Sequence, residues 1–143
     1  MNDNCPIFVF KDNTVKRIVD LAIKKLRNNP QKPNLIWLEA TGCSGNIISL
    51  LNATNPDIIF FLKNMVNMTY NNSLMSQEGE NAFEKFLNTL ETEFILVVEG
   101  AVSTKNNGLY TIIARYHSQL ITAMDAVRMA GEKAKYIIAV GTC

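Results

Sequence analysis

Residues 35–51, LIWLEATGCSGNIISLL, contain the pattern that decides the fold. The four apolar residues Leu35–Leu38 indicate a buried strand, and apolar residues recur at helical spacing from Ile47 to Leu51. A short turn containing Gly42 and Gly45 separates the two segments. A strand, a glycine-containing turn and a helix form the first half of a β-α-β unit. We therefore expect the turn to present main-chain N–H groups and a helix N-terminus to any bound group.

Cys43 lies in this turn. A thiolate next to a helix N-terminus is stabilised, so the side chain would be available as a metal ligand or a nucleophile. The alternative interpretation is that Cys43 is a small side chain that fills a tight loop. Its position in the turn alone leaves both interpretations open.

The composition is that of one globular domain. The chain has 143 residues, of which 48% are hydrophobic and 19% charged, and its formal net charge is +1. This balance gives no reason to expect binding to nucleic acid or to an anionic membrane. We see no secretory signal and no apolar run of the roughly 18 residues that a spanning helix needs. The three cysteines are too few for a disulfide framework, so a reducing, cytoplasmic setting is expected.

Further elements follow from the pattern of apolar and polar residues. Phe94–Val98 and Tyr136–Val140 are predicted to be buried strands because they are continuous β-branched and apolar runs. The other expected elements are a short edge strand at Ile7–Phe10, an amphipathic helix with its apolar stripe between Val15 and Leu26, a strand or short apolar helix at Ile58–Leu62, a loop at Asn64–Ser73, a helix at Ser76–Leu90, a polar loop at Ser103–Gly108 and a long helix within Ile112–Ala130.

Strands that alternate with helices predict an α/β fold. We expect a flavodoxin-like domain of three layers at 34–143, with a mostly parallel sheet of about four to five strands, preceded by an extension at 1–33 with one amphipathic helix. Ligands of such sheets bind at the carboxyl ends of the strands. Cys43, the pair Glu99-Gly100, and Cys143 each follow a predicted strand. The two cysteines are therefore predicted to approach each other, which favours metal binding or redox chemistry.

Several motifs occur in a fixed order between about residues 34 and 143. They are Trp37–Leu51, Asn52–Asp57, Ser73–Met75 with Gly79–Ala82, Val97–Val102, Asn107–Tyr110 and Gly141–Cys143. In these stretches the chain resembles the N-terminal, flavodoxin-like domain of the small subunit of nickel–iron hydrogenases, a family related to the complex I subunit that carries its last cluster. The first 33 residues match no family that we can name.

The resemblance implies an iron–sulfur cofactor. In that family the domain holds a proximal [4Fe–4S] cluster through four cysteines, one for each iron. The matching positions here are Ala40, Cys43, Thr111 and Cys143, so only Cys43 and Cys143 keep a thiol. The resemblance also implies an electron-transfer role and a large-subunit or other redox partner. Hydrogen turnover by this chain alone is not expected, because the nickel ligands of the family belong to the other subunit.

Three hypotheses follow from two cysteines. Two chains could share one cluster across a two-fold axis, each supplying Cys43 and Cys143; this homodimer would hold a [4Fe–4S] cluster or, as the alternative, a [2Fe–2S] centre. Thr111 or Glu39 could instead complete a mixed-ligand cluster within one chain, although oxygen is a weak ligand for this chemistry. Finally, the domain could have lost its cluster and serve as a protein-interaction module.

Other polar residues are assigned supporting roles. Main-chain amides of the turn at Gly42 would donate hydrogen bonds to cluster sulfides. Glu39, which in the family lies beside the cluster, is predicted to accept hydrogen bonds from loop amides, as is Glu99. His117 is expected at the start of a helix as a structural or surface side chain and not as a metal ligand. Cys5 is interpreted as a spectator.

Overall fold

The computed structural model describes residues 17, 20–21, 24 and 31–141. The strand expected at Ile7–Phe10, Cys5 and Cys143 lie outside these residues, as does most of the helix expected between Val15 and Leu26. The chain divides into two units, Met1–Gln31 and Lys32–Cys143. All of the architecture that follows belongs to the second unit. The domain boundaries at 33 and 34 stay a prediction.

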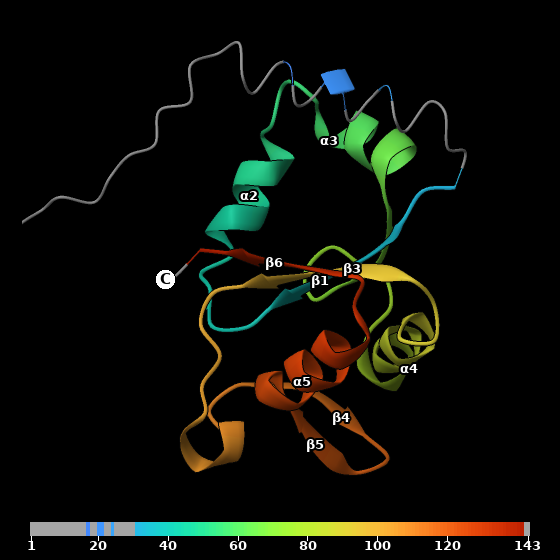
Figure 1. Ribbon diagram of the computed structural model, residues 1–143. Coiled ribbons are helices and arrows are strands. Elements are labelled where there is room, and N and C mark those ends of the chain that lie inside the picture. The colour runs from blue at the N-terminus through green and yellow to red at the C-terminus, as the bar shows by residue number, and fades with distance from the viewer. Residues whose placement is uncertain (1–16, 18–19, 22–23, 25–30, 142–143) are drawn as a thin grey trace, which may run out of the picture. The chain divides into compact units, whose positions relative to one another are not determined.

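Four parallel strands form the central sheet, in the order β2-β1-β3-β6 (Figure 1). Their bounds are β1 Asn34–Glu39, β2 Asn67–Asn71, β3 Phe94–Glu99 and β6 Tyr136–Val140. The two inner strands are apolar along almost their whole length because helices or loops cover both faces of a parallel sheet. The predicted α/β, flavodoxin-like fold with a mostly parallel sheet is confirmed.

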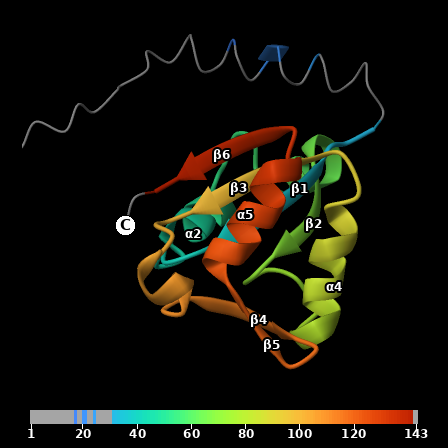
Figure 2. The same ribbon diagram turned by 60° about the horizontal axis from the view of Figure 1, so that its bottom comes forward.

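Helices lie on both faces of this sheet and make three layers (Figures 1 and 2). On one face lie α2 (Gly45–Leu51), α3 (Ile58–Phe60) and the π-helical η1 (Phe61–Met65). On the other lie α4 (Gly79–Thr89), α5 (Ala123–Lys133) and a hairpin of β4 (Ile112–Tyr116) with β5 (Gln119–Thr122). The 3-10 turn η2 (Lys105–Gly108) packs against α5. None of the described helices is long and apolar enough to cross a membrane.

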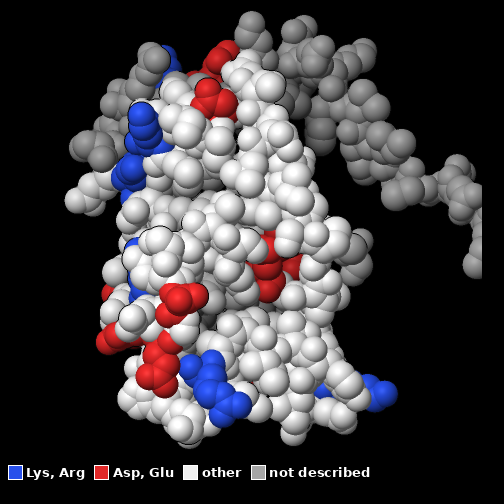
Figure 3. All heavy atoms as spheres, turned by 180° about the vertical axis from the view of Figure 1, so that it is seen from behind, with Lys and Arg blue, Asp and Glu red and all other residues white. Residues whose placement is uncertain are grey.

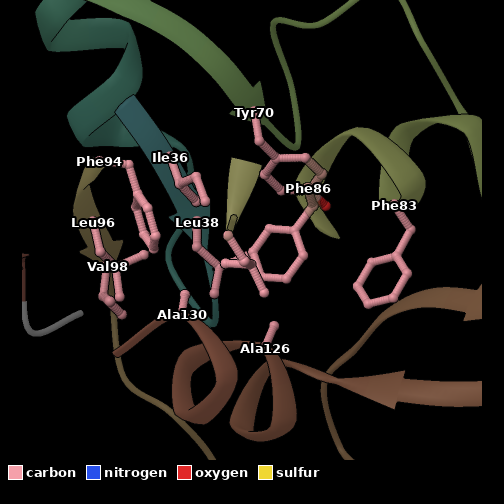
Figure 4. Packing of buried hydrophobic residues seen from close by; sticks show 11 residues of the cluster. Ile36, Leu38, Tyr70, Phe83, Phe86, Phe94, Leu96, Val98, Ala126 and Ala130 are labelled. Atoms are coloured by element: carbon pink, nitrogen blue, oxygen red, sulfur yellow. The ribbon is translucent and has the colours of Figure 1, made fainter. Parts of the chain in front are cut away.

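Alternate residues of β1 and β3 supply two separate cores. Ile36 and Leu38 point towards α4 and α5, where they meet Phe86 and the small side chains of Ala126 and Ala130 (Figure 4). The two alanines are fully buried and allow α5 to pack closely against the sheet. On the opposite face a smaller cluster forms, made of Leu35, Trp37, Ile47, Val66 and Val97.

The prediction of a loop at Asn64–Ser73 is wrong, because this segment contains β2. Its polar residues find partners in the sheet: Asn67 Nδ2 donates to Asn34 Oδ1 at 2.8 Å, and Thr69 Oγ1 donates to the carbonyl of Leu35 at 3.1 Å. Polar side chains are tolerated here because β2 lies at the edge of the sheet. At Ile58–Leu62, of the two elements expected, the helical one is observed.

The long helix predicted within Ile112–Ala130 begins only at Ala123. The preceding residues form the β4–β5 hairpin, which turns at His117 and Ser118 with positive φ values of 46° and 65°. Thr122 then starts α5 with a capping box, in which its hydroxyl and the carboxylate of Asp125 exchange hydrogen bonds with each other's main-chain N–H groups. His117 therefore lies in a hairpin turn and not at a helix start, and its main-chain N–H donates to Glu80 Oε1 at 2.8 Å.

β6 is a strand, as predicted, but it is not buried. Tyr136, Ile137 and Ile138 are 61%, 58% and 48% exposed. β6 is hydrogen-bonded to β3 on one side and forms the second edge of the sheet. An apolar edge strand of this kind is ordinarily covered or paired.

Candidate functional site

The carboxyl ends of β1, β3 and β6 lie in register at one edge of the sheet. Glu39 is paired with Glu99, and Glu99 with Val140. Beyond the strands, the main-chain N–H of Ala40 donates to the carbonyl of Glu99 and that of Gly100 to the carbonyl of Val140, both at 2.9 Å. The turn after β1 and the segment that leads to the chain's last cysteine therefore begin side by side.

Gly141 extends this contact to the Cys43 turn. It has a φ of +67°, and a Cβ at this position would collide with the side-chain amide of Asn46, in the first turn of α2. Cys143 itself lies outside the described residues. Two extended residues span at most about 7 Å, which limits how far Cys143 can be from Gly141. The structure thus brings Gly141 to the segment that contains Cys43.

Glu99 lies under the turn and is fully buried. Trp37 Nε1 donates to Glu99 Oε2 at 2.7 Å, and Asn46 Nδ2 donates to Glu99 Oε1 at 3.3 Å. Among the described residues the donors are thus side chains, in place of the loop amides predicted. A buried carboxylate needs such donors, since its desolvation is otherwise costly. Glu99 therefore ties α2 to strands β1 and β3.

Two glycines allow the turn to lie close to the end of β3. A Cβ on Gly100, whose φ is +82°, would be 2.5 Å from the main-chain N of Gly42. A Cβ on Gly42 would be 3.3 Å from Glu99 Cγ. Any larger residue at position 100 would move the turn, because main-chain atoms cannot yield as a side chain can. Thr41 adds a further link, with its hydroxyl donating to the carbonyl of Ala101 at 2.7 Å.

Within the part of the chain that the structure describes, hydroxyl groups donate to the Glu39 carboxylate, in place of the loop amides predicted. Ser44 Oγ and Ser73 Oγ donate to Glu39 Oε2 at 3.0 and 2.9 Å. Its other carboxylate oxygen, Oε1, is buried and has no hydrogen-bond partner in the described part of the chain. Burial, followed by the nearby Glu39 carboxylate, raises the pKa of Tyr70 above its ordinary value of about 10.

Cys43 is exposed at the tip of the turn. The next residue, Ser44, takes a left-handed conformation with φ 60° and begins α2, which has only seven residues. A helix of two turns contributes little to anion binding, so its dipole does not account for a ligand at this turn. What the turn does offer is an accessible sulfur on a backbone fixed from below by Glu99, Gly100 and Thr41.

Thr111 is predicted as a further ligand position. It is held by hydrogen bonds to a part of the chain other than the Cys43 turn. It follows η2, its N–H donates to the carbonyl of Gly108 at 3.1 Å, and its own carbonyl accepts from the N–H of Ala123 at 2.8 Å. Its main chain is therefore anchored to η2 and to the start of α5.

The resemblance assigns four ligand positions to the cluster, and two of them carry no thiol here. The family's positions at Ala40 and Thr111 lack thiols, which leaves Cys43 and Cys143. Among the described residues there is no group of three or more His, Cys, Asp and Glu side chains able to hold a metal ion. A cubane needs one external ligand on each of its four irons. At these positions the chain therefore supplies two of the four thiolates.

Sequence reasoning missed four side chains that build this site, namely Trp37, Asn46, Ser44 and Ser73. Their partners are two carboxylates that the sequence did single out, Glu39 and Glu99. The available signal was a pair of glutamates at the ends of buried strands. Such carboxylates require donors, and the nearest polar residues on neighbouring strands and turns were candidates.

The family model described as NADH ubiquinone oxidoreductase, 20 Kd subunit, matches residues 43–143. The chain therefore belongs to this family. The relatives that it matches are small subunits of nickel–iron hydrogenases. It is 32% identical over 129 residues to the periplasmic [NiFeSe] hydrogenase small subunit of Desulfomicrobium baculatum, covering 85% of this chain and 41% of that protein. It is 35% identical over 118 residues to the hydrogenase-2 small chain of Escherichia coli K12, covering 80% and 30%.

Solved structures agree with this assignment. The recombinant [NiFeSe] hydrogenase of Desulfovibrio vulgaris Hildenborough superposes with a TM-score of 0.75 at 32% identity, over 78% of this chain and 40% of the hydrogenase chain. The reduced, active [NiFeSe] hydrogenase of Desulfomicrobium baculatum gives 0.75 at 33% identity, over 78% and 42%. The chain thus spans less than half of the length of these relatives.

Proposed function

We propose that this chain is an electron-transfer protein in which two copies share one iron–sulfur cluster, each copy contributing Cys43 and Cys143. The observation that carries the proposal is the register of β1, β3 and β6 at their carboxyl ends. Gly141 lies against Asn46, so that the last described residue before the C-terminal Thr-Cys pair lies beside the turn that holds Cys43. Kinship with hydrogenase small subunits supports the cofactor class.

A two-fold axis accounts for the number of ligands. An isologous dimer doubles every ligand, so two thiolates per chain become the four that a [4Fe–4S] cluster needs. A [2Fe–2S] centre needs four as well and is the alternative product. The exposure of Cys43 at the tip of its turn supports contact between two chains at this point. Main-chain amides from Gly42 to Gly45 would donate to the cluster sulfides, and Thr111 and Glu39 are the oxygen ligands of the mixed-ligand alternative.

A second polypeptide partner follows from the same kinship. Relatives of this chain are small subunits, and we propose a hydrogenase-like large subunit or another redox protein as its electron-exchange partner. Hydrogen turnover by this chain alone is not part of the proposal. The cytoplasmic location also stays a proposal, and the names of some relatives place them in the periplasm.

The alternative function is a cluster-free interaction module. The absence of thiols at Ala40 and Thr111 favours it, as do the exposed apolar residues of β6 and of the η2–β4 segment, Leu109 and Tyr110. Figure 3 shows one face on which charged side chains lie in small separate groups, with wide uncharged areas between them. Surfaces of this kind suit protein contact more than binding to a polyanion.

The two functions are separated by replacing single cysteines. After anaerobic purification, the Cys43→Ala chain should lack the visible absorbance and iron of a bridged cluster, because each copy then supplies only Cys143. Cys5→Ala, the matched control, should keep both. Iron retained in full by Cys43→Ala would reject the ligand assignment, and a wild-type protein without colour or iron would favour the interaction module.

A further inference from the structure

Asn46 lies where the two segments that carry the site cysteines meet. It is the second residue of α2 and follows Cys43 by three positions. A Cβ on Gly141 would collide with the Asn46 side-chain amide, so the chain beyond β6 runs directly against this amide. Asn46 is therefore in contact with the last described residue before the C-terminal Thr-Cys pair.

The buried carboxylate of Glu99 fixes the orientation of this amide. Asn46 Nδ2 donates to Glu99 Oε1 at 3.3 Å, and a carboxylate accepts hydrogen bonds without donating them. The other oxygen of Glu99 accepts from Trp37 Nε1 at 2.7 Å, so the carboxylate cannot turn away from Asn46 without losing that bond. The side chain at position 46 must therefore be short and must end in a donor.

The sulfur of Cys43 lies over the start of the same helix. A Cβ on Gly45, the first residue of α2, would be 3.2 Å from Cys43 Sγ. Ser44 precedes α2 without giving it a side-chain cap, and its hydroxyl donates to Glu39 instead. Asn46, one residue beyond Gly45, links the first turn of α2 to the end of β3. A displacement of Asn46 would therefore move the backbone against which the sulfur rests.

We propose that Asn46 is a positioning residue of the cysteine site. By contacting Glu99 and Gly141 together, it holds the turn after β1 and the end of β6 at one separation. The inference rests on the proposed function, which makes Cys43 and Cys143 the ligands. Ligand side chains need fixed supports, because a small displacement of a ligand lowers the affinity of its site. An alanine at position 46 would remove both contacts at once.

The test measures how readily the two thiols of one chain are bridged. The full chain with Cys5→Ala is freed of iron, reduced, and treated at low concentration with a short bis(methanethiosulfonate) reagent. Mass spectrometry of the denatured chain separates the first attachment of the reagent from closure of the bridge, and a bridge within one chain keeps the mass of a monomer. Asn46→Ala should slow closure about tenfold and leave the first attachment unchanged, since closure depends steeply on the geometry of the reacting groups.

Asn52→Ala is the matched control. Asn52 also donates from its side-chain amide, to the carbonyl of Ile48 at 3.0 Å, but at the other end of α2. Its closure rate should equal that of the parent chain, with circular dichroism confirming that each variant is folded. Equal closure rates for Asn46→Ala and Asn52→Ala, or no closure in the parent chain, would overturn the proposal. Because the chain carries no iron, a protein that never binds a cluster still gives a result, and an iron-binding chain that closes equally fast without Asn46 rejects this inference alone.

A second variant leaves the hydrogen bond to Glu99 in place. Gly141→Ala puts a Cβ against the amide of Asn46, so it should slow closure in the parent chain. In the Asn46→Ala chain the colliding amide is absent, and the same change should slow closure by a smaller factor. Such non-additivity is expected of two residues that act through one contact. Equal slowing by Gly141→Ala in both chains would show that Asn46 does not position the end of β6 and would overturn the proposal.

Discussion

On one face of the sheet, two helices of eleven residues each and a hairpin close over Ile36, Leu38, Leu96 and Val98. On the other face, α2 has seven residues and buries only Ile47. The α4/α5 face therefore supplies most of the apolar burial that stabilises the domain. The α2 face carries the Cys43 turn and two of the exposed side chains of β6, Tyr136 and Ile138, which pair with Ile95 and Val97. The difference teaches that stability and candidate function are divided between the two faces.

The largest effect on stability is expected on the α4/α5 face. Phe86 is fully buried and packs between Tyr70 and Phe83, with ring centroids at 5.2 and 5.3 Å. Phe86→Ala should lower the free energy of unfolding by about 3–5 kcal/mol, because it leaves a large cavity. Urea denaturation measures this. Ile59→Ala, at a 57% exposed position on the other face, is the control and should cost less than about 0.5 kcal/mol.

A smaller loss of stability is expected where Glu99 attaches α2 to the sheet. Trp37→Phe keeps an aromatic ring but removes the N–H that donates to the buried Glu99 at 2.7 Å. The free energy of unfolding should fall by about 1–3 kcal/mol, since the carboxylate loses a partner that water cannot replace there. A change below about 0.5 kcal/mol in the same urea experiment would contradict the role assigned to Glu99.

The effect of Tyr70 on the pH dependence of stability appears only at high pH. Burial raises the pKa of Tyr70 in the folded chain above its ordinary value of about 10. The unfolded chain then loses the phenol proton before the folded chain does, so the contribution of Tyr70 to stability is constant below about pH 10 and falls as the pH rises above it. The variant Tyr70→Phe should lose this part of the decline, measured as the midpoint of thermal unfolding between pH 9 and 11. Identical profiles for the two chains would show that Tyr70 is not the group responsible.

The smallest effect is expected at the exposed edge. Val97 and Ile138 are paired in register on β3 and β6, but Val97 is 4% and Ile138 48% exposed. Ile138→Thr should change the free energy of unfolding by no more than about 0.5 kcal/mol. The matched change Val97→Thr should cost about 1–3 kcal/mol, because it buries a hydroxyl. Equal costs would mean that β6 is covered in solution.

The sequence was sufficient for the parts of the fold with strong local patterns. The β1–turn–α2 unit and β3 were predicted because apolar runs and glycines occur together there. β2 was missed because an edge strand tolerates Asn67, Thr69 and Asn71, which normally signal a loop. The β4–β5 hairpin was missed because its turn uses His117 and Ser118 in place of the usual glycine or asparagine.

The candidate site was predicted in its outline and not in its detail. Topology alone placed the Cys43 turn and the last strand at one edge, since parallel strands share their carboxyl ends. The partners of Glu39 and Glu99 could not be predicted, because they come from positions up to 62 residues away in the chain. The one-residue bulge at Thr69 shifts the register of β2 against β1, and no local pattern signals such a change.

The most direct test of the central proposal is the stoichiometry of iron, acid-labile sulfide and protein in one anaerobic sample, with the molar mass measured by light scattering. A shared cluster predicts a dimer with about four irons and four sulfides, or about two of each for a [2Fe–2S] centre, held by four cysteines. A colourless monomer without iron would contradict it and would leave the α2 face as a surface for binding other proteins.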